Sequence, residues 1–437
     1  MIMVSSFPPA SGADRFFSVL SSLLLFAFLA LLMTFRYSYA VVPLLAGGVA
    51  FCRLVFVWLQ PGHSLRLGRG DVFCLTALLL FSLLWLADVV RTGKWPVGEG
   101  NQGILLPLWP MLAALVLMAW RAFPPKAGFW WAGVALGALL AGGIASYEHW
   151  VLGRGRPDNG MNAIPFGNVS LLLATLSLVG LLARLGMRPV KGEWWLRGFY
   201  ALAVGAGLLA AVLSGTRGSW IVFPALILLV FGVFWRQLHR GGMVALAVLV
   251  AVVVLSASFM PRAGVTQRVA QAVQNLEEYT EGDTYSSLGI RLEMWRAGAR
   301  LFREKPILGW GEGRLEARRD QWVSEGLYDK GISRYDQLHN DLIDTAARRG
   351  LVGLISLLLL YGVPLVLFAK HLRRRKDVQG QALALSGVIV VVAFIGFGLT
   401  QSLLRDVRGL SGFLGMLTAC WCLLKATPEV GGEGTQA

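Results

Sequence analysis

His339 is the residue of this chain whose type and position best suit proton transfer. A histidine exchanges a proton near neutral pH, and this one ends a long polar segment shortly before an apolar run that begins at Gly350. An imidazole at such a border indicates general acid–base chemistry on a substrate held at a membrane surface. The alternative is a histidine at a helix start whose ring is satisfied by backbone groups.

Arginines near the ends of apolar runs form a second group of candidates. Arg217 lies in the tight turn SGTRGS and Arg291 begins an amphipathic segment, while Arg154 and Arg156 share a shorter polar loop. A guanidinium stays charged and presents a planar set of donors that matches phosphate oxygens. These residues are therefore candidates for binding a diphosphate or a glycan. Asn340, beside the histidine, could bind a sugar or orient the histidine. For each arginine the alternative is a lipid-headgroup contact or an ion pair.

Other kinds of chemistry have no motif in this chain. The sequence contains no His-Glu-x-x-His or Asp-x-Asp motif, no phosphate-binding loop and no dinucleotide fingerprint. We therefore expect no metal and no cofactor. A substrate that is already activated, such as a lipid diphosphate, would make nucleotide hydrolysis unnecessary.

The elements that must position these residues are membrane helices. Of 437 residues, 56% are hydrophobic, and the mean hydropathy is +0.61. An apolar run of about 20 residues crosses a bilayer as a helix, and helices satisfy their own backbone in lipid. The sequence predicts an all-α integral membrane protein of about twelve transmembrane helices. The expected runs are roughly 16–35, 39–59, 72–90, 104–120, 128–147, 165–183, 198–214, 219–235, 242–260, 350–369, 380–402 and 409–425.

The net charge of +15 reports topology and does not indicate nucleic acid. In the twelve-helix arrangement, lysine and arginine concentrate in alternate loops, which is the positive-inside pattern. This pattern predicts cytoplasmic N- and C-termini and places the segment 261–349 on the opposite side. The basic loops contain Arg66, Arg69, Arg121, Lys126, Arg184, Arg188, Lys191, Arg236, Arg240, Lys370, Arg373, Arg374, Arg375 and Lys376.

The chain divides into four predicted parts. Residues 1–260 hold nine membrane helices, 261–349 form a loop domain, 350–425 hold three further helices, and 426–437 form a disordered cytoplasmic tail. The loop domain has 14 basic and 14 acidic residues, so it is not a polybasic tether. Apolar spacing predicts helices over 267–279 and over 291–302, the latter with Leu292, Trp295, Ala299 and Phe302 on one face. A turn-rich stretch, 306–313, and a helix over 338–347 follow.

Three motifs in this order resemble the O-antigen ligase and polymerase superfamily of Gram-negative envelope enzymes. They are Arg217 in SGTRGSW, Arg291 in RLEMW followed by KPILGWG, and His339-Asn340 followed after nine residues by Gly350-x-x-Gly353. The segment IPFG at 164–167 also looks like a motif of that family. The resemblance covers the whole topology, including one large loop late in the chain.

The resemblance implies a GT-C-like, inverting and metal-independent glycosyltransferase with a periplasmic active site in the bacterial inner membrane. The implied donor is an undecaprenyl-diphosphate-linked O-antigen, and the implied acceptor is a sugar hydroxyl of lipid A–core. His339 would then act as general base, with Arg217 and Arg291 stabilising the departing diphosphate. Gly350 and Gly353 would let the helix pack closely.

Three alternatives remain open. An O-antigen polymerase would use a second lipid-linked glycan as acceptor, and a protein O-oligosaccharyltransferase would use a serine or threonine. A transporter of lipid-linked saccharides is expected to carry polar residues inside several spans. Most charges of this chain lie at the ends of the apolar runs, which favours an enzyme.

Overall fold

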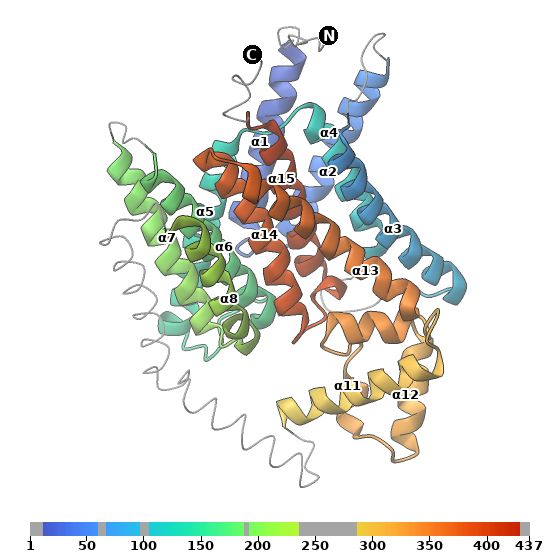
Figure 1. Ribbon diagram of the computed structural model, residues 1–437. Coiled ribbons are helices and arrows are strands. Elements are labelled where there is room, and N and C mark those ends of the chain that lie inside the picture. Colours follow the sequence, from blue (N-terminus) through green and yellow to red (C-terminus); the bar gives the residue numbers. More distant parts are fainter. Residues whose placement is uncertain (1–11, 60–66, 97–104, 188–191, 236–285, 429–437) are drawn as a thin grey trace.

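The computed structural model describes residues 12–59, 67–96, 105–187, 192–235 and 286–428, and these ranges contain helices but no strand (Figure 1). The all-α prediction is confirmed for this part of the chain. The α-helices are α1 Gly12–Leu31, α2 Ser38–Leu59, α3 Arg69–Thr92, α4 Trp109–Ala122, α5 Ala127–Ser146, α6 Ala163–Leu185, α7 Glu193–Leu213, α8 Arg217–Phe234, α11 Ser287–Glu304, α12 Arg314–Ser324, α13 Asp341–Arg374, α14 Val378–Gly398 and α15 Val407–Ala426. Short turns of other helix types are η1 Leu106–Leu108, η2 Tyr147–Val151, η3 Lys330–Arg334 and η4 Leu403–Arg405.

Membrane-spanning length is reached by many of these helices. Within the described ranges, nine helices are long and apolar enough to cross a bilayer, and the apolar helices Leu106–Ala122 and Trp220–Phe234 are shorter. Eleven of the twelve predicted runs therefore coincide with an apolar helix. The twelfth, 242–260, lies outside the described residues, as does the predicted helix 267–279.

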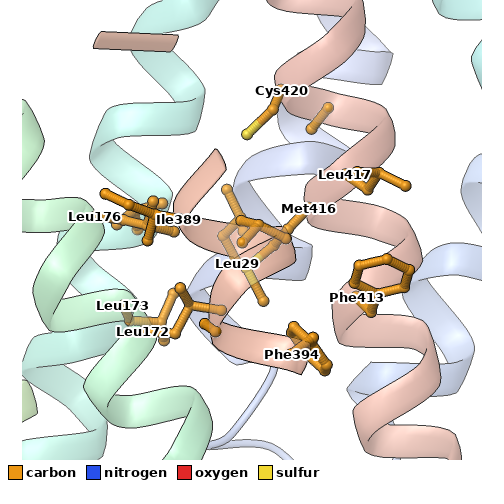
Figure 2. Packing of buried hydrophobic residues seen from close by; sticks show 14 of the residues in the cluster. Leu29, Leu172, Leu173, Leu176, Ile389, Phe394, Phe413, Met416, Leu417 and Cys420 are labelled. Atoms are coloured by element: carbon orange, nitrogen blue, oxygen red, sulfur yellow. The ribbon is translucent and has the colours of Figure 1, made fainter. Parts of the chain in front are cut away.

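The helices α6 and α15 form the centre of the bundle. In the most apolar 18-residue stretch of each of these two helices, 94% is buried, whereas the corresponding share for α1 is 33%. Leu172 of α6 and Phe413 of α15 belong to one large apolar core that also includes residues of α1 and α14 (Figure 2). A central helix has little freedom to shift, so its ends are rigid points from which a site can be built.

The two ends of the helix bundle hold different parts of the chain. In Figure 1, α1 begins and α15 ends at the upper end, while α11 and α12 lie below the lower end. The lower end also holds the turn between α7 and α8, which is as tight as the sequence predicts: α7 ends at Leu213 and α8 begins at Arg217.

Residues 286–349, called the helical module here, have an apolar core of their own. It is formed by Met294, Ala297, Leu301, Leu315, Trp322, Tyr328, Ile332, Leu338 and Ala347. The predicted apolar face of 291–302 is only partly inward: Trp295 packs against this core, but Met294, Ala297 and Leu301 are the buried residues and Ala299 is exposed. The helix also begins earlier, at Ser287, where the side chain of Ser286 caps it by accepting from Gly289 N at 3.0 Å.

The long helix α13 is interrupted at Gly350, which has φ +61° and ψ −155°. The turn-rich stretch of the module lies across this break: Leu351 N donates to Pro306 O at 2.7 Å, and Trp310 N donates to Ala347 O at 3.0 Å. A Cβ at Gly350 would lie 2.3 Å from Ile307 O. The glycine is therefore required by a positive φ and by close contact with a loop backbone, whereas the sequence suggested packing between helices.

Candidate functional site

A polar cavity of about 600 Å³ lies between the helical module and the lower end of the bundle. It brings together residues from the loop before α6, from α11, from the segment before α13 and from the linker between α14 and α15. The lining residues are Arg156, Asp158, Met161, Asn162, Ala163, Ile164, Ile290, Arg291, Met294, Arg334, Tyr335, Asp336, Gln337, His339 and Gln401. Three residues predicted from sequence, His339, Arg291 and Arg156, are thus placed in one cavity.

His339 is held in a defined orientation at the cavity wall. Its backbone has φ +51°, a left-handed conformation that is uncommon for residues other than glycine, and the residue is only 8% exposed. The Nδ1 atom is hydrogen-bonded to Oε1 of Gln401. The ring of Tyr335 meets the imidazole edge-on, with 5.0 Å between ring centroids. Backbone strain of this kind is found where surrounding contacts fix a functional side chain.

Asn340 caps α13 and bonds to the linker between α14 and α15. Its side-chain oxygen caps α13 by accepting from Leu342 N at 3.0 Å and from Ile343 N at 3.1 Å, and its Nδ2 donates to Leu399 O at 3.1 Å. Asn340 is buried and is not among the lining residues. Of the two roles expected from the sequence, orienting His339 therefore suits Asn340 better than direct substrate binding.

Arg291 lies on the second turn of α11 and lines the cavity with Ile290 and Met294. Met294 is fully buried in the core of the helical module. Trp295 fixes this part of α11 to the segment of His339, because its indole N–H donates to Leu338 O at 3.1 Å. The position of the guanidinium stem is thus tied to that of the imidazole.

Arg154 and Arg156, which the sequence analysis grouped, have different surroundings in the loop between α5 and α6. The Nε atom of Arg156 donates to Ser214 O at 3.2 Å, and this residue lines the cavity. Arg154 is not among the lining residues. It forms an ion pair with Glu148 at 2.7 Å, and its side chain is 48% exposed. Glu148 also accepts from Asp158 N at 2.8 Å, so the Arg154–Glu148 pair shapes the loop that presents Arg156.

The backbone of Arg217 begins α8, and contacts of the two neighbouring residues show where it lies. Thr216 Oγ1 donates to Ala163 O at 2.7 Å, and Ala163 lines the cavity. On the other side, a Cβ at Gly218 would lie 2.3 Å from Thr400 Oγ1, and Thr400 precedes the lining residue Gln401. The backbone of Arg217 therefore lies between two segments that each contribute to the cavity.

Several lining residues were not singled out from the sequence. Arg334 adds a cation, Asn162 caps α6 by accepting from Ile164 N at 2.9 Å, and Asp336 adds a carboxyl whose pKa is raised by burial although Arg405 and Arg348 oppose the shift. Gln401 had no signal beyond its place at the end of an apolar run. Of these residues, only Asn162 had a recognisable sequence signal, because an asparagine directly before an apolar run is a typical helix cap.

A buried ion-pair cluster joins the helical module to the linker between α14 and α15. Glu312 accepts from Arg348 at 2.9 Å and from Arg405 at 2.5 Å, and Arg348 also pairs with Asp344 at 3.0 Å. The Arg348 side chain is 0% exposed. Burial by itself would raise the pKa of Glu312, but attraction by Arg348 and Arg405 outweighs it and lowers the pKa from 4.5 to about 2.

Replacing Glu312 with glutamine should destabilise the protein by about 3 kcal/mol or more, because it leaves buried arginine charge uncompensated. The pKa of Glu312 is depressed in the folded state, so its contribution is complete above about pH 4.5 and is lost as the pH falls toward 2. Thermal unfolding of purified protein should therefore show a lower midpoint for Glu312→Gln at pH 7 and a smaller decline between pH 5 and pH 3 than in the wild type.

The control for this variant is Glu304→Gln, which removes a partly exposed pair with Arg318. Such pairs contribute about 0–1 kcal/mol, so its midpoint should stay close to that of the wild type. Equal midpoints for all three proteins at pH 7 would contradict the structural weight given to the cluster.

Comparison with known proteins identifies the class to which this helical membrane protein is related. Residues 202–358 match the family model described as O-antigen ligase. That stretch contains Arg217, Arg291 and His339, and the resemblance predicted from the motifs is confirmed.

Two curated relatives extend the comparison. A protein of Haemophilus influenzae, described as uncharacterized, is 25% identical over 374 residues, which is 85% of this chain and 90% of the relative. The O-antigen ligase of Escherichia coli K12 is 25% identical over 199 residues, which is 45% of this chain and 44% of that ligase. The matched stretch thus covers less than half of the named ligase.

Proposed function

We propose that the cavity is the active site of an inverting, metal-independent glycosyltransferase of the O-antigen ligase kind. The observation that carries the proposal is the placement of His339 and Arg291 in one cavity, inside the stretch that matches the O-antigen ligase model. The donor would be a polysaccharide linked to undecaprenyl diphosphate, and the acceptor would be a sugar hydroxyl of lipid A–core.

The reaction needs a base and a site for the leaving group. His339 takes the proton of the acceptor hydroxyl as the hydroxyl oxygen forms a bond to the anomeric carbon. The bond between that carbon and the phosphate oxygen breaks, and its electron pair leaves with the lipid diphosphate. Arg291 and Arg217 stabilise the negative charge that develops there. Attack from the face opposite the leaving group inverts the anomeric centre.

The charged residues of the lining favour an anionic substrate in this cavity. Arg156 and Arg334 line it together with Arg291, and these three arginines outnumber the carboxyls of Asp158 and Asp336. The first residues of α6 belong to the lining, and α13 begins two residues after His339. The first N–H groups of these helices already donate to Asn162 and Asn340, so the helix starts offer an anion the positive end of the helix dipole. A diphosphate would thus meet positive potential from side chains and from backbone.

The proposed orientation follows from the loop charges. The basic residues predicted to be cytoplasmic include Arg121 in the last turn of α4, Lys126 just after that helix, and Arg373 in the last turn of α13. The cavity lies at the end of the bundle that carries the helical module, which this orientation places in the periplasm. A lipid-linked donor could then reach it from the outer leaflet of the inner membrane.

Purified protein should transfer polysaccharide from the lipid-linked donor to lipid A–core when both are supplied in detergent or vesicles. The measurement is the shift of the acceptor on a gel, with parallel reactions that offer a second lipid-linked glycan or a serine-containing peptide. Transfer should persist in EDTA. Exclusive transfer to the second glycan would show that the protein is a polymerase and not a ligase. Exclusive transfer to the peptide would show that it is a protein glycosyltransferase. If no acceptor received polysaccharide and the donor moved across the bilayer, the protein would be a transporter and not an enzyme.

A further inference from the structure

The linker between α14 and α15, residues 399–406, supplies the residue that contacts the imidazole. It connects two helices of the large apolar core and lies at the lower end of the bundle (Figure 1). Gln401 is buried, with 3% of its surface exposed, yet it lines the cavity and bonds to Nδ1 of His339. A polar side chain in such a place needs a reason, because burial of an amide costs free energy unless it is hydrogen-bonded.

The linker is fastened on both sides of Gln401. Leu399 O accepts from Asn340 Nδ2 at 3.1 Å, and Ser402 Oγ accepts from Asn340 N at 3.1 Å. Leu404 N donates to Asp341 at 3.2 Å. The two residues that follow His339 in the chain therefore bind the residues that flank Gln401.

A third attachment comes from the helical module. Arg405 at the end of the linker pairs with Glu312 at 2.5 Å, and Glu312 is also bound by Arg348 of α13. Imidazole and amide are consequently held by two segments that are joined by backbone, side-chain and ionic contacts. This arrangement fixes the position of Gln401 relative to His339 more firmly than one hydrogen bond would.

We propose that Gln401 is a positioning residue whose side-chain oxygen accepts a hydrogen bond from Nδ1–H of His339, so that Nε2 is the nitrogen that deprotonates the acceptor hydroxyl. The inference rests on the proposed function for its chemical consequence. Which ring nitrogen carries the proton in a neutral histidine is set by the hydrogen bond that the other nitrogen makes. An amide oxygen facing Nδ1 favours a proton there, and Nε2 then holds the lone pair. The neutral amide fixes the tautomer without the charge that a carboxylate partner would add.

Nuclear magnetic resonance tests the tautomer without reference to transfer. With ¹⁵N-labelled histidine, only five residues contribute, and the signals of His339 are those lost in His339→Ala. In the wild type at alkaline pH, Nδ1 should show the shift of a protonated nitrogen and Nε2 that of an unprotonated one. In Gln401→Leu the signals should move toward the opposite tautomer. A proton on Nε2 in the wild type would overturn the proposal, even if transfer is fully active.

The pH dependence of transfer tests the consequence. Gln401→Leu should lower kcat by about tenfold or more with little change in KM for the donor, since one buried hydrogen bond to the base is lost. Gln401→Glu keeps an acceptor oxygen and adds a charge that favours imidazolium, so the acidic limb of the profile should move up by about one to three pH units. At high pH this variant should regain most of the wild-type rate.

The matched control is Gln381→Leu, the same substitution at the start of α14, where the Gln381 amide donates to Arg375 O at 2.8 Å. It should leave both the rate and the profile unchanged. A Gln401→Glu enzyme that loses activity at every pH with an unmoved limb would show that Gln401 is only structural, and the proposal would be rejected. Absence of transfer by the wild type would reject the proposed function and leave the tautomer measurement to decide this inference alone.

Discussion

His339→Ala should lower the transfer rate by about a hundredfold to ten-thousandfold, the range contributed by a positioned general base. The protein should remain folded and inserted, because the imidazole lies at a cavity wall and the cores of the bundle and of the helical module do not include it. The rate is measured as single-turnover transfer from lipid-linked donor to lipid A–core by purified protein in vesicles.

The control is His149→Ala. His149 belongs to η2 at the end of α5, bonds to Arg154 O at 3.0 Å and is not a lining residue. It should retain a rate within about twofold of the wild type. If His339→Ala transferred polysaccharide at the wild-type rate, proton abstraction by this residue would have to be abandoned.

Arg291→Lys should lower kcat by about tenfold to a hundredfold although the charge is kept. A lysine presents one ammonium on a flexible stem, whereas the guanidinium presents a rigid pair of donors to two phosphate oxygens. Removal of one donor that acts on developing negative charge costs about 10²–10³ in kcat, and lysine recovers part of this. Arg217→Lys should have a similar effect, measured in the same assay.

Arg296→Lys separates this effect from a general loss of helix charge. Arg296 lies on the same helix, pairs with Glu293 at 3.4 Å and has a side chain that is 67% exposed. Its substitution should change kcat by less than about twofold. Wild-type rates for Arg291→Lys and Arg217→Lys would mean that the two arginines supply only nonspecific charge.

Most membrane helices were predictable because their signal is local. A run of apolar residues determines a membrane helix irrespective of its neighbours, and eleven predicted runs have a helix in the structure. The inward face of α11 was not predictable to the position, because spacing gives the period of a helix but the packing partners select the face. Met294 is buried by residues such as Trp322 and Ile332, which follow much later in the chain.

The site itself was predictable in part for a related reason. His339 and Arg291 were recognised by type and by motif, and roles in one reaction were expected for them. Gln401 carries no local signal, because its importance comes from one contact to a residue 62 positions earlier. The sequence left open whether Asn340 orients the histidine or a sugar, because its cap on α13 and its bond to Leu399 O depend on the fold.

The most direct measurement for the central claim is rescue of His339→Ala by added imidazole in the single-turnover assay. A cavity of about 600 Å³ has room for imidazole beside the acceptor hydroxyl. If His339 is the base, the rate should rise with the concentration of unprotonated imidazole and fall again when the pH is lowered. Full activity without imidazole, or a folded variant whose rate no imidazole concentration raises, would contradict the assignment of His339 as the group that deprotonates the acceptor.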